Sequence, residues 1–147
     1  MKSLLMFEEF LKIGTIIKRA PENSRASFLI KESKRKYKSL NQILDKIGIN
    51  ELNAHEIIEY SYDILIYLLR AKLYAEGFTS TGEGAHEAEV SYMRNLNFNE
   101  NDVLFMNQLR YFRNGIKYYG KVLGKDYAER VLDFLHKNYP RLLEVVK

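Results

Sequence analysis

The segment from Ile57 to Ala75 is apolar on nearly all sides when it is drawn as a helix. Its large apolar residues are Ile57, Ile58, Ile64, Leu65, Ile66, Leu68, Leu69 and Leu73. A helix on the surface of a domain is apolar on one face only, so this segment has to pack against several neighbours or against a partner subunit. The rest of the chain is therefore expected to supply elements that surround it.

The composition fits one folded domain. A chain of 147 residues has little room for more, which excludes most multidomain enzymes. Hydrophobic residues make up 46% of it and charged residues 29%, so it can bury a core. We predict a single domain over residues 1–147, with residues 1–20 as an accessory N-terminal helix. The chain has no cysteine, which excludes disulfides, thiolate catalysis and sulfur-ligated metal sites.

Helical spacing of apolar residues recurs along the chain, whereas the alternation typical of strands is almost missing. Helices are predicted over residues 3–18, 22–46, 57–75, 85–96, 99–119 and 126–145. Asn53 and Glu56 have the spacing of a capping box before the third helix, and Asn99 with Asp102 can cap the fifth. Residues 77–84 are predicted to form a loop. We expect an all-α fold, an up-and-down antiparallel bundle of five to six helices.

No apolar segment of the sequence is long enough to form a membrane-spanning helix. The most apolar short run, residues 64–69, lies between Asp63 and Arg70 and is far shorter than the roughly 20 residues that a span needs. Near the N-terminus, Glu8 and Glu9 interrupt the apolar stretch before it reaches the usual length of a secretory signal. We expect a cytoplasmic protein with no membrane partner.

The predicted helix at 99–119 has an apolar stripe and, beside it, a row of cations. The stripe consists of Phe105, Leu109, Phe112, Ile116 and Tyr119, and the row of Arg110, Arg113, Lys117 and Lys121. Cations three or four residues apart on a helix repel one another, so local helix stability does not explain the row. Three explanations stay open: countercharge from carboxylates such as Glu83, Glu87 or Glu89, a bound phosphate or nucleic-acid backbone, or a subunit interface.

The histidines and the glycine-rich loop are less specific. His55, His86 and His136 have no metal-chelating spacing, so we expect neither a metal nor a cofactor. The loop at 77–84 has glycines and hydroxyls before a helix, which can offer backbone N–H groups to an anion, but it lacks the lysine and the spacing of a P-loop. We therefore favour a plain loop-to-helix connection, with Ser80 or Thr81 near the cap, over a nucleotide-binding loop. His86 would reach the cationic row only through tertiary packing.

Two motifs together suggest a family. The first is Gly77-Phe78 followed by Gly82-Glu83-Gly84-Ala85-His86, and the second is Leu109-Arg110-Tyr111-Phe112-Arg113-Asn114 followed by Tyr118-Tyr119. In order and spacing they resemble the HEPN domain family (higher eukaryotes and prokaryotes nucleotide-binding), from about the second predicted helix to the C-terminus. The resemblance implies a bundle of about five helices that commonly dimerises. It also implies either metal-independent RNA cleavage or pairing with a small nucleotidyltransferase in a toxin–antitoxin system.

The catalytic signature of this family is an arginine followed a few residues later by a histidine. Arg113-Asn114 matches its beginning, but Tyr118 or Tyr119 stands where the histidine is expected. Attack by a ribose 2′-OH needs a proton acceptor, a proton donor and a cation near the phosphorane, and Arg113 can supply the cation. A tyrosine with a pKa of about 10 is ionised to roughly one part in a thousand at pH 7, so Tyr118 is a poor base.

We therefore expect a homodimeric HEPN-like domain that binds RNA or nucleotide phosphate without efficient catalysis. The predicted phosphate-binding residues are Arg110, Arg113, Asn114, Lys117 and Lys121. The first alternative is a metal-independent endoribonuclease that uses Arg113 with Tyr118, or with His86. The second is a protein-interaction module that buries the helix at 57–75 or the one at 99–119 against another protein and has no role with nucleic acid. A small nucleotidyltransferase is the partner that the resemblance implies.

Overall fold

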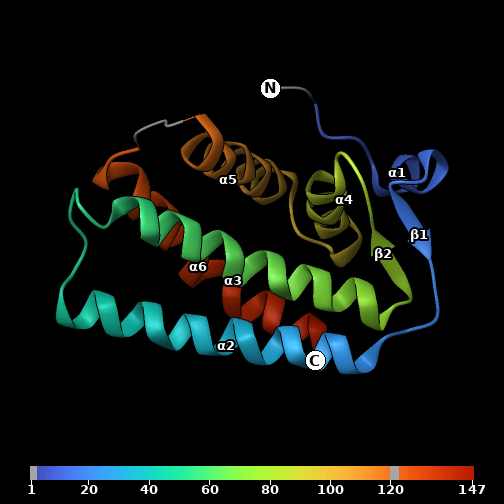
Figure 1. The fold of residues 1–147 in the computed structure, drawn as a ribbon, viewed down its shortest axis with the longest axis horizontal. Helices are drawn as coiled ribbons and strands as arrows, with labels where there is room; N and C mark the ends of the chain where they lie inside the picture. The colour runs from blue at the N-terminus through green and yellow to red at the C-terminus, as the bar shows by residue number, and fades with distance from the viewer. Residues whose placement is uncertain (1–2, 120–122) are drawn as a thin grey trace.

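The computed structural model describes residues 3–119 and 123–147, and the side chains of these residues except 116–119. Its elements in chain order are α1 (Phe7–Ile13), β1 (Ile16–Lys18), α2 (Asn23–Lys46), α3 (Ala54–Ala75), β2 (Phe78–Ser80), α4 (Ala85–Ser91), the 3₁₀ helix η1 (Tyr92–Leu96), α5 (Glu100–Tyr119) and α6 (Lys125–Val146). The four long helices α2, α3, α5 and α6 run in alternating directions (Figure 1). The predicted all-α antiparallel bundle is confirmed.

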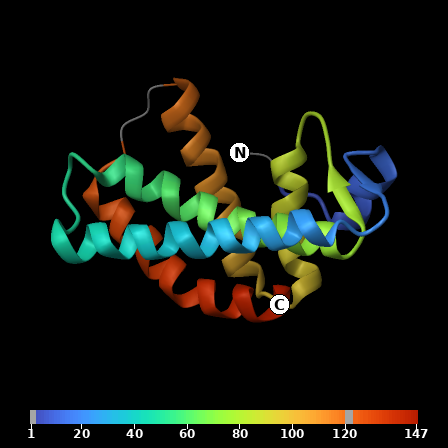
Figure 2. The ribbon, with the colours of Figure 1, turned by 60° about the horizontal axis from the view of Figure 1, so that its bottom comes forward.

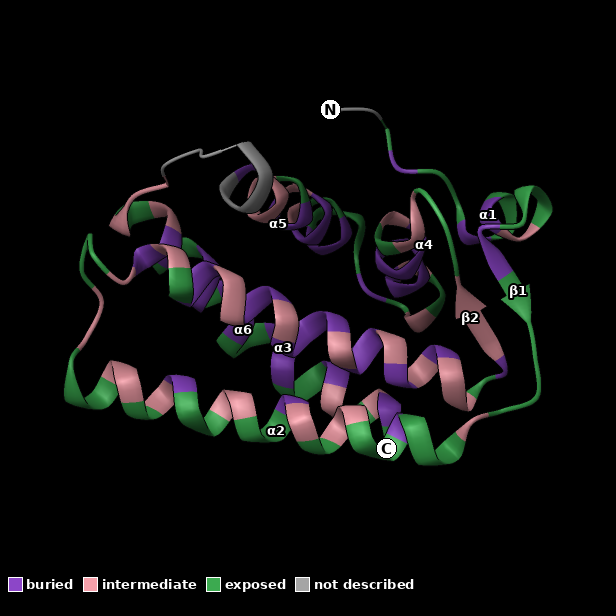
Figure 3. Ribbon diagram, viewed as in Figure 1, coloured by how far each residue is buried: buried purple, intermediate pink, exposed green. Residues whose placement is uncertain are grey.

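Helix α3 is the central element of the bundle. It packs against α2, α4, α5, α6 and β2, and its buried positions lie on several sides of the helix (Figure 3). Ile64, Leu68 and Leu69 have no exposed surface. The buried apolar residues form a continuous cluster from Leu4 to Val146. The apolar character of residues 57–75 is thus explained by packing within the chain.

The N-terminal segment differs from the predicted helix over residues 3–18. Helix α1 begins only at Phe7 and ends at Ile13, because Gly14 takes a left-handed conformation with φ 85° and its N–H bonds the carbonyl of Leu11. The β-branched residues that follow favour an extended chain and form β1. The prediction of one long accessory helix was therefore wrong.

Strand β1 pairs with β2 in a short antiparallel two-stranded sheet, and β2 lies in the segment that was predicted to be a loop. Ile16 lies opposite Ser80 and Lys18 opposite Phe78. Hydrogen bonds from Thr81 N to Thr15 O (2.9 Å) and from Arg19 N to Gly77 O (2.8 Å) extend the pairing at both ends. This sheet and α1 lie at one end of the molecule, and the connection between α2 and α3 lies at the other (Figure 2).

Two further details of the helices correct the expectations. The helix predicted over residues 85–96 is α at first and continues from Tyr92 as the 3₁₀ helix η1. Helix α3 begins after Asn53 as expected, but the Asn53 side chain does not cap it. Its Oδ1 instead accepts a hydrogen bond from Asn50 N (2.9 Å), and its Nδ2 donates to Gly48 O (2.8 Å). The side chain thus stabilises the loop before the helix.

Candidate functional site

A pocket of about 250 Å³ lies where the segment entering α4 meets α5. It is lined by Gly82, Gly84, Ala85, His86, Glu87, Arg110 and Asn114. The two sequence motifs singled out above, which are separated by more than twenty residues, therefore meet in space. Three predicted site residues, His86, Arg110 and Asn114, line this pocket, which we call the α4–α5 pocket.

Arg110 is held inside the wall of the α4–α5 pocket. The start of α5 is fixed by Asn99, whose Oδ1 accepts a hydrogen bond from Asp102 N at 2.8 Å, as the sequence predicted. Only 10% of the Arg110 side chain is exposed, and its Nε donates to Asn107 Oδ1 at 2.9 Å. Its Nη1 lies 3.8 Å from Glu87 Oε1, and the Glu87 side chain is 41% exposed. An exposed carboxylate at that distance is a weakly held counterion.

Arg113 turns away from the pocket toward α3. Its Nη2 lies 3.5 Å from Asp63 Oδ1, and its guanidinium carbon lies 5.4 Å from the centre of the Tyr62 ring. Asp63 also pairs with Lys36, at 3.7 Å. The Nε of Arg113 is buried and has no hydrogen-bond partner among the described residues. Arg110 and Arg113 therefore point to different surroundings and do not form one continuous row.

Both arginines of the row have carboxylate partners in the part of the chain that is described. Glu87 was among the expected partners, and it pairs with Arg110. Arg113 is paired instead with Asp63, which the sequence did not suggest. Glu89, the most buried of the expected partners, binds neither of them. An anion that enters the α4–α5 pocket and contacts Arg110 would compete with Glu87 for this guanidinium.

Both carboxylate oxygens of Glu89 accept hydrogen bonds from a different group of residues. Arg70 donates to it in a bidentate manner, from Nε to Oε2 at 2.7 Å and from Nη2 to Oε1 at 3.0 Å. The hydroxyl of Ser80 donates to Oε2 at 3.0 Å. Only 1% of the Glu89 side chain is exposed. This buried carboxylate ties α3, β2 and α4 together behind the pocket.

His86 lines the pocket and is exposed to solvent. The pocket wall still covers enough of its ring that partial burial lowers the pKa of the imidazole below its ordinary value. Glu89 opposes this lowering, whereas Arg70, Arg113 and Arg110 reinforce it. This shift favours the neutral imidazole, in which one of the ring nitrogens can accept a proton.

The residues of α3 that border this region were missed by the sequence analysis. Tyr62 is buried, and its hydroxyl has no hydrogen-bond partner among the residues that the structure describes. Burial, aided by the charge of Glu89, raises the pKa of this hydroxyl. A partial signal was present in the sequence, since Asp63 and Arg70 are the charged residues on either side of the apolar run 64–69.

Three predicted site residues cannot be placed in this geometry. The backbone of Lys117 and Tyr118 belongs to α5, but their side chains lie outside the described residues, and so does the whole of Lys121. The predicted pairing of Arg113 with Tyr118 stays a prediction. Among the side chains that are described, no group of three His, Asp or Glu residues is placed to hold a metal ion.

Comparison with protein-family models, with curated proteins and with solved structures gave no match. Over residues 3–119 and 123–147, no helix combines the length and hydrophobicity that crossing a lipid bilayer requires. The assignment of a function therefore depends on the geometry of the α4–α5 pocket and on the resemblance of its two motifs.

Proposed function

We propose that the α4–α5 pocket binds a backbone phosphate of RNA and that the protein does so without efficient catalysis. Arg110 and Asn114 are the side chains that contact the phosphate. Glu87 is the group that the phosphate displaces. The observation that carries the proposal is the convergence of Arg110, Asn114 and His86 on one small polar pocket from segments far apart in the sequence.

The local charges support the exchange of Glu87 for a phosphate. Four cations around α3, α4 and α5 share three carboxylates; the cations are Lys36, Arg70, Arg110 and Arg113, and the carboxylates are Asp63, Glu87 and Glu89. The unbalanced cation of this group is at Asp63, which both Lys36 and Arg113 contact, whereas in the pocket Glu87 alone balances Arg110. An arginine binds a phosphate in a bidentate manner with good geometry, whereas Glu87 is 3.8 Å away and exposed. Binding by RNA therefore exchanges a weak ion pair for a stronger one.

Replacing Arg110 by glutamine is expected to weaken RNA binding about tenfold, because one charge-assisted hydrogen bond to phosphate is lost. The measurement is fluorescence anisotropy with a short single-stranded RNA at several salt concentrations. The slope of log affinity against log salt should also become shallower by about 0.7, the value for one phosphate contact to a single strand. The matched control is Arg130→Gln, which removes an exposed arginine of α6. Equal affinities and slopes for the two variants would contradict the proposal.

A catalytic function is the second candidate, and the position of His86 favours it. His86, whose neutral form is favoured by partial burial, and Arg110 bring a proton acceptor and a cation into one pocket, two of the three groups that metal-independent cleavage through the 2′-OH requires. Incubation with structured RNA in EDTA tests this candidate. Products that end in a 2′,3′-cyclic phosphate and disappear in both His86→Ala and Arg110→Ala would replace the non-catalytic proposal with this one.

The resemblance to the HEPN family supports this proposal and extends it to partners. The two motifs that carry the resemblance are the two that line the α4–α5 pocket. On the same resemblance we propose that the protein forms a homodimer and pairs with a small nucleotidyltransferase in a toxin–antitoxin system.

A further inference from the structure

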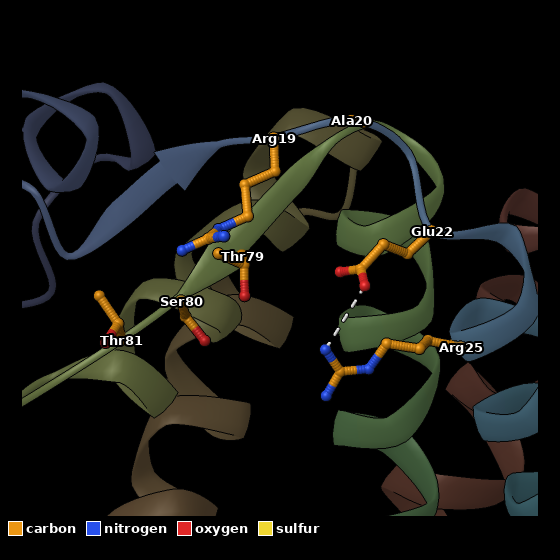
Figure 4. A pocket seen from close by; sticks show the side chains of 7 residues that line it. All are labelled: Arg19, Ala20, Glu22, Arg25, Thr79, Ser80 and Thr81. Carbon is orange, nitrogen blue, oxygen red and sulfur yellow. Dashed lines mark ion pairs between the residues drawn. The ribbon is translucent and has the colours of Figure 1, made fainter.

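A second and larger cavity lies between β2 and the start of α2. Its volume is about 600 Å³, which is within the usual range for small-molecule sites. It is lined by Arg19, Ala20, Glu22, Arg25, Thr79, Ser80 and Thr81. Figure 4 shows the guanidinium of Arg25 extending from α2 toward β2, while that of Arg19 lies over β2 beside Thr79. We call it the β2–α2 cavity. None of these residues lines the α4–α5 pocket.

The backbone around this cavity is held in a fixed shape. Arg19 N donates to Gly77 O at 2.8 Å, and Glu22 N donates to Tyr74 O at 3.0 Å. Gly77 has φ 83°, and a Cβ at this position would lie 2.6 Å from the carbonyl oxygen of Arg19. Only glycine permits this approach. The chain that carries Arg19 is therefore anchored against the turn between α3 and β2.

The charged groups of the β2–α2 cavity suit a phosphate. Among the described residues, Arg19 forms no hydrogen bond or ion pair through its side chain. Arg25 pairs with Glu22 at 3.6 Å, and both residues are open to solvent, so this pair is weak. The hydroxyls of Thr79 and Thr81 add hydrogen-bond donors on the strand side. Two arginines and two hydroxyls around one cavity match the oxygens of a phosphate monoester.

An apolar cavity of about 420 Å³ adjoins the β2–α2 cavity and shares Arg25 with it. It is lined by Ser24, Arg25, Phe28, Leu29, Arg70 and Tyr74. The cavity is open to solvent on the side where Phe28 lies, since this residue is 63% exposed. The Arg25 guanidinium lies 4.6 Å from the centre of the Tyr74 ring. An exposed phenylalanine beside a stacked arginine provides surfaces on which a nucleobase can stack.

Glu89 accepts hydrogen bonds from one residue of each cavity. Its Oε2 accepts hydrogen bonds from Ser80, which lines the β2–α2 cavity, and from Arg70, which lines the apolar one. Because this carboxylate is buried, the two walls are fixed relative to each other before any ligand binds. Such preorganisation lowers the entropic cost of binding.

We propose that the two cavities together bind a nucleoside monophosphate. Its phosphate lies between Arg19 and Arg25 beside the hydroxyls of Thr79 and Thr81, and its base stacks on Phe28. A polar cavity for the phosphate and ribose and an apolar, aromatic one for the base lie side by side, with Arg25 at the boundary. The proposal stands without the RNA-binding function, because it uses different residues.

Isothermal titration calorimetry with AMP, GMP, CMP and UMP tests this site. At least one of the four is expected to bind with one site per chain, and more tightly than ribose 5-phosphate or its nucleoside alone. Arg19→Gln and Arg25→Gln should each weaken that nucleotide at least tenfold, and Phe28→Ala should bring its affinity close to that of ribose 5-phosphate. All three residues are exposed, so the variants should fold, and a thermal melt checks this.

The controls separate this site from nonspecific attraction and from the α4–α5 pocket. Lys38→Gln removes an exposed cation of the same helix and should leave the nucleotide affinity unchanged. Arg110→Gln should also leave it unchanged, whatever its effect on RNA. The proposal is overturned if none of the four nucleotides binds, or if Arg19→Gln and Arg25→Gln weaken binding no more than Lys38→Gln does.

Discussion

Replacing Glu89 by alanine is expected to lower the free energy of unfolding by about 3 kcal/mol. The substitution removes both hydrogen bonds to Arg70 and the one to Ser80, and it leaves the guanidinium of Arg70 largely buried without a counterion. An unpaired buried charge costs more than the loss of the contacts alone, because the group has been removed from water. Urea unfolding followed by circular dichroism measures the change.

The control for this experiment is Glu76→Ala. Glu76 also pairs with a cation at 2.7 Å, namely Lys72, but 45% of its side chain is exposed. An exposed pair of this kind contributes about 0.5 kcal/mol or less. If Glu89→Ala is no more destabilising than Glu76→Ala, Glu89 does not hold α3, β2 and α4 together as we describe.

Leu68→Ala is expected to lower the free energy of unfolding by about 3 kcal/mol, through the loss of buried surface and the cavity left behind. Leu68 has no exposed surface and lies in α3, which contacts all the other long helices. Leu52→Ala removes the same atoms from a residue that is 90% exposed, so its effect should be within about 0.5 kcal/mol. Similar unfolding midpoints for the two variants in urea would show that α3 is not the centre of the core.

The bundle could be predicted because its long helices carry strong periodic signals. The apolar residues on nearly all sides of segment 57–75 predicted several packing partners, and in the structure four other helices contact α3. Asn99 was identified as a cap from its position alone, and its side chain does bond Asp102 N. Local patterns of this kind are visible in the sequence because they repeat over several turns or depend on neighbouring residues.

The strands could not be predicted because each is only three residues long. Ile16–Lys18 and Phe78–Ser80 are too short to show alternation, and they pair across about sixty residues of chain. The end of α1 at Gly14 was a missed local signal, since glycine commonly ends a helix in the left-handed conformation. The pairing itself is a tertiary effect that no short window contains.

The sequence identified some of the residues that line the candidate site, but not their arrangement. Arg110, Asn114 and His86 were identified from the sequence and line one pocket. The helical wheel placed Arg113 in the same row, but it could not show that Asp63 and Tyr62 of α3 would draw this side chain away. Partners on another helix depend on how the helices cross, and the sequence of a single helix does not contain that information.

We propose that RNA phosphate and Glu87 compete for Arg110, and measuring the RNA affinities of Glu87→Gln and Glu83→Gln tests this competition. Each variant removes one negative charge near the start of α4, Glu87 in its first turn and Glu83 just before it, but Glu83 is exposed and has no ion pair among the described residues. We predict that Glu87→Gln binds a short RNA roughly threefold to tenfold more tightly than Glu83→Gln does, because only Glu87→Gln frees Arg110. Equal affinities, or weaker binding by Glu87→Gln, would show that Glu87 does not compete with RNA for Arg110.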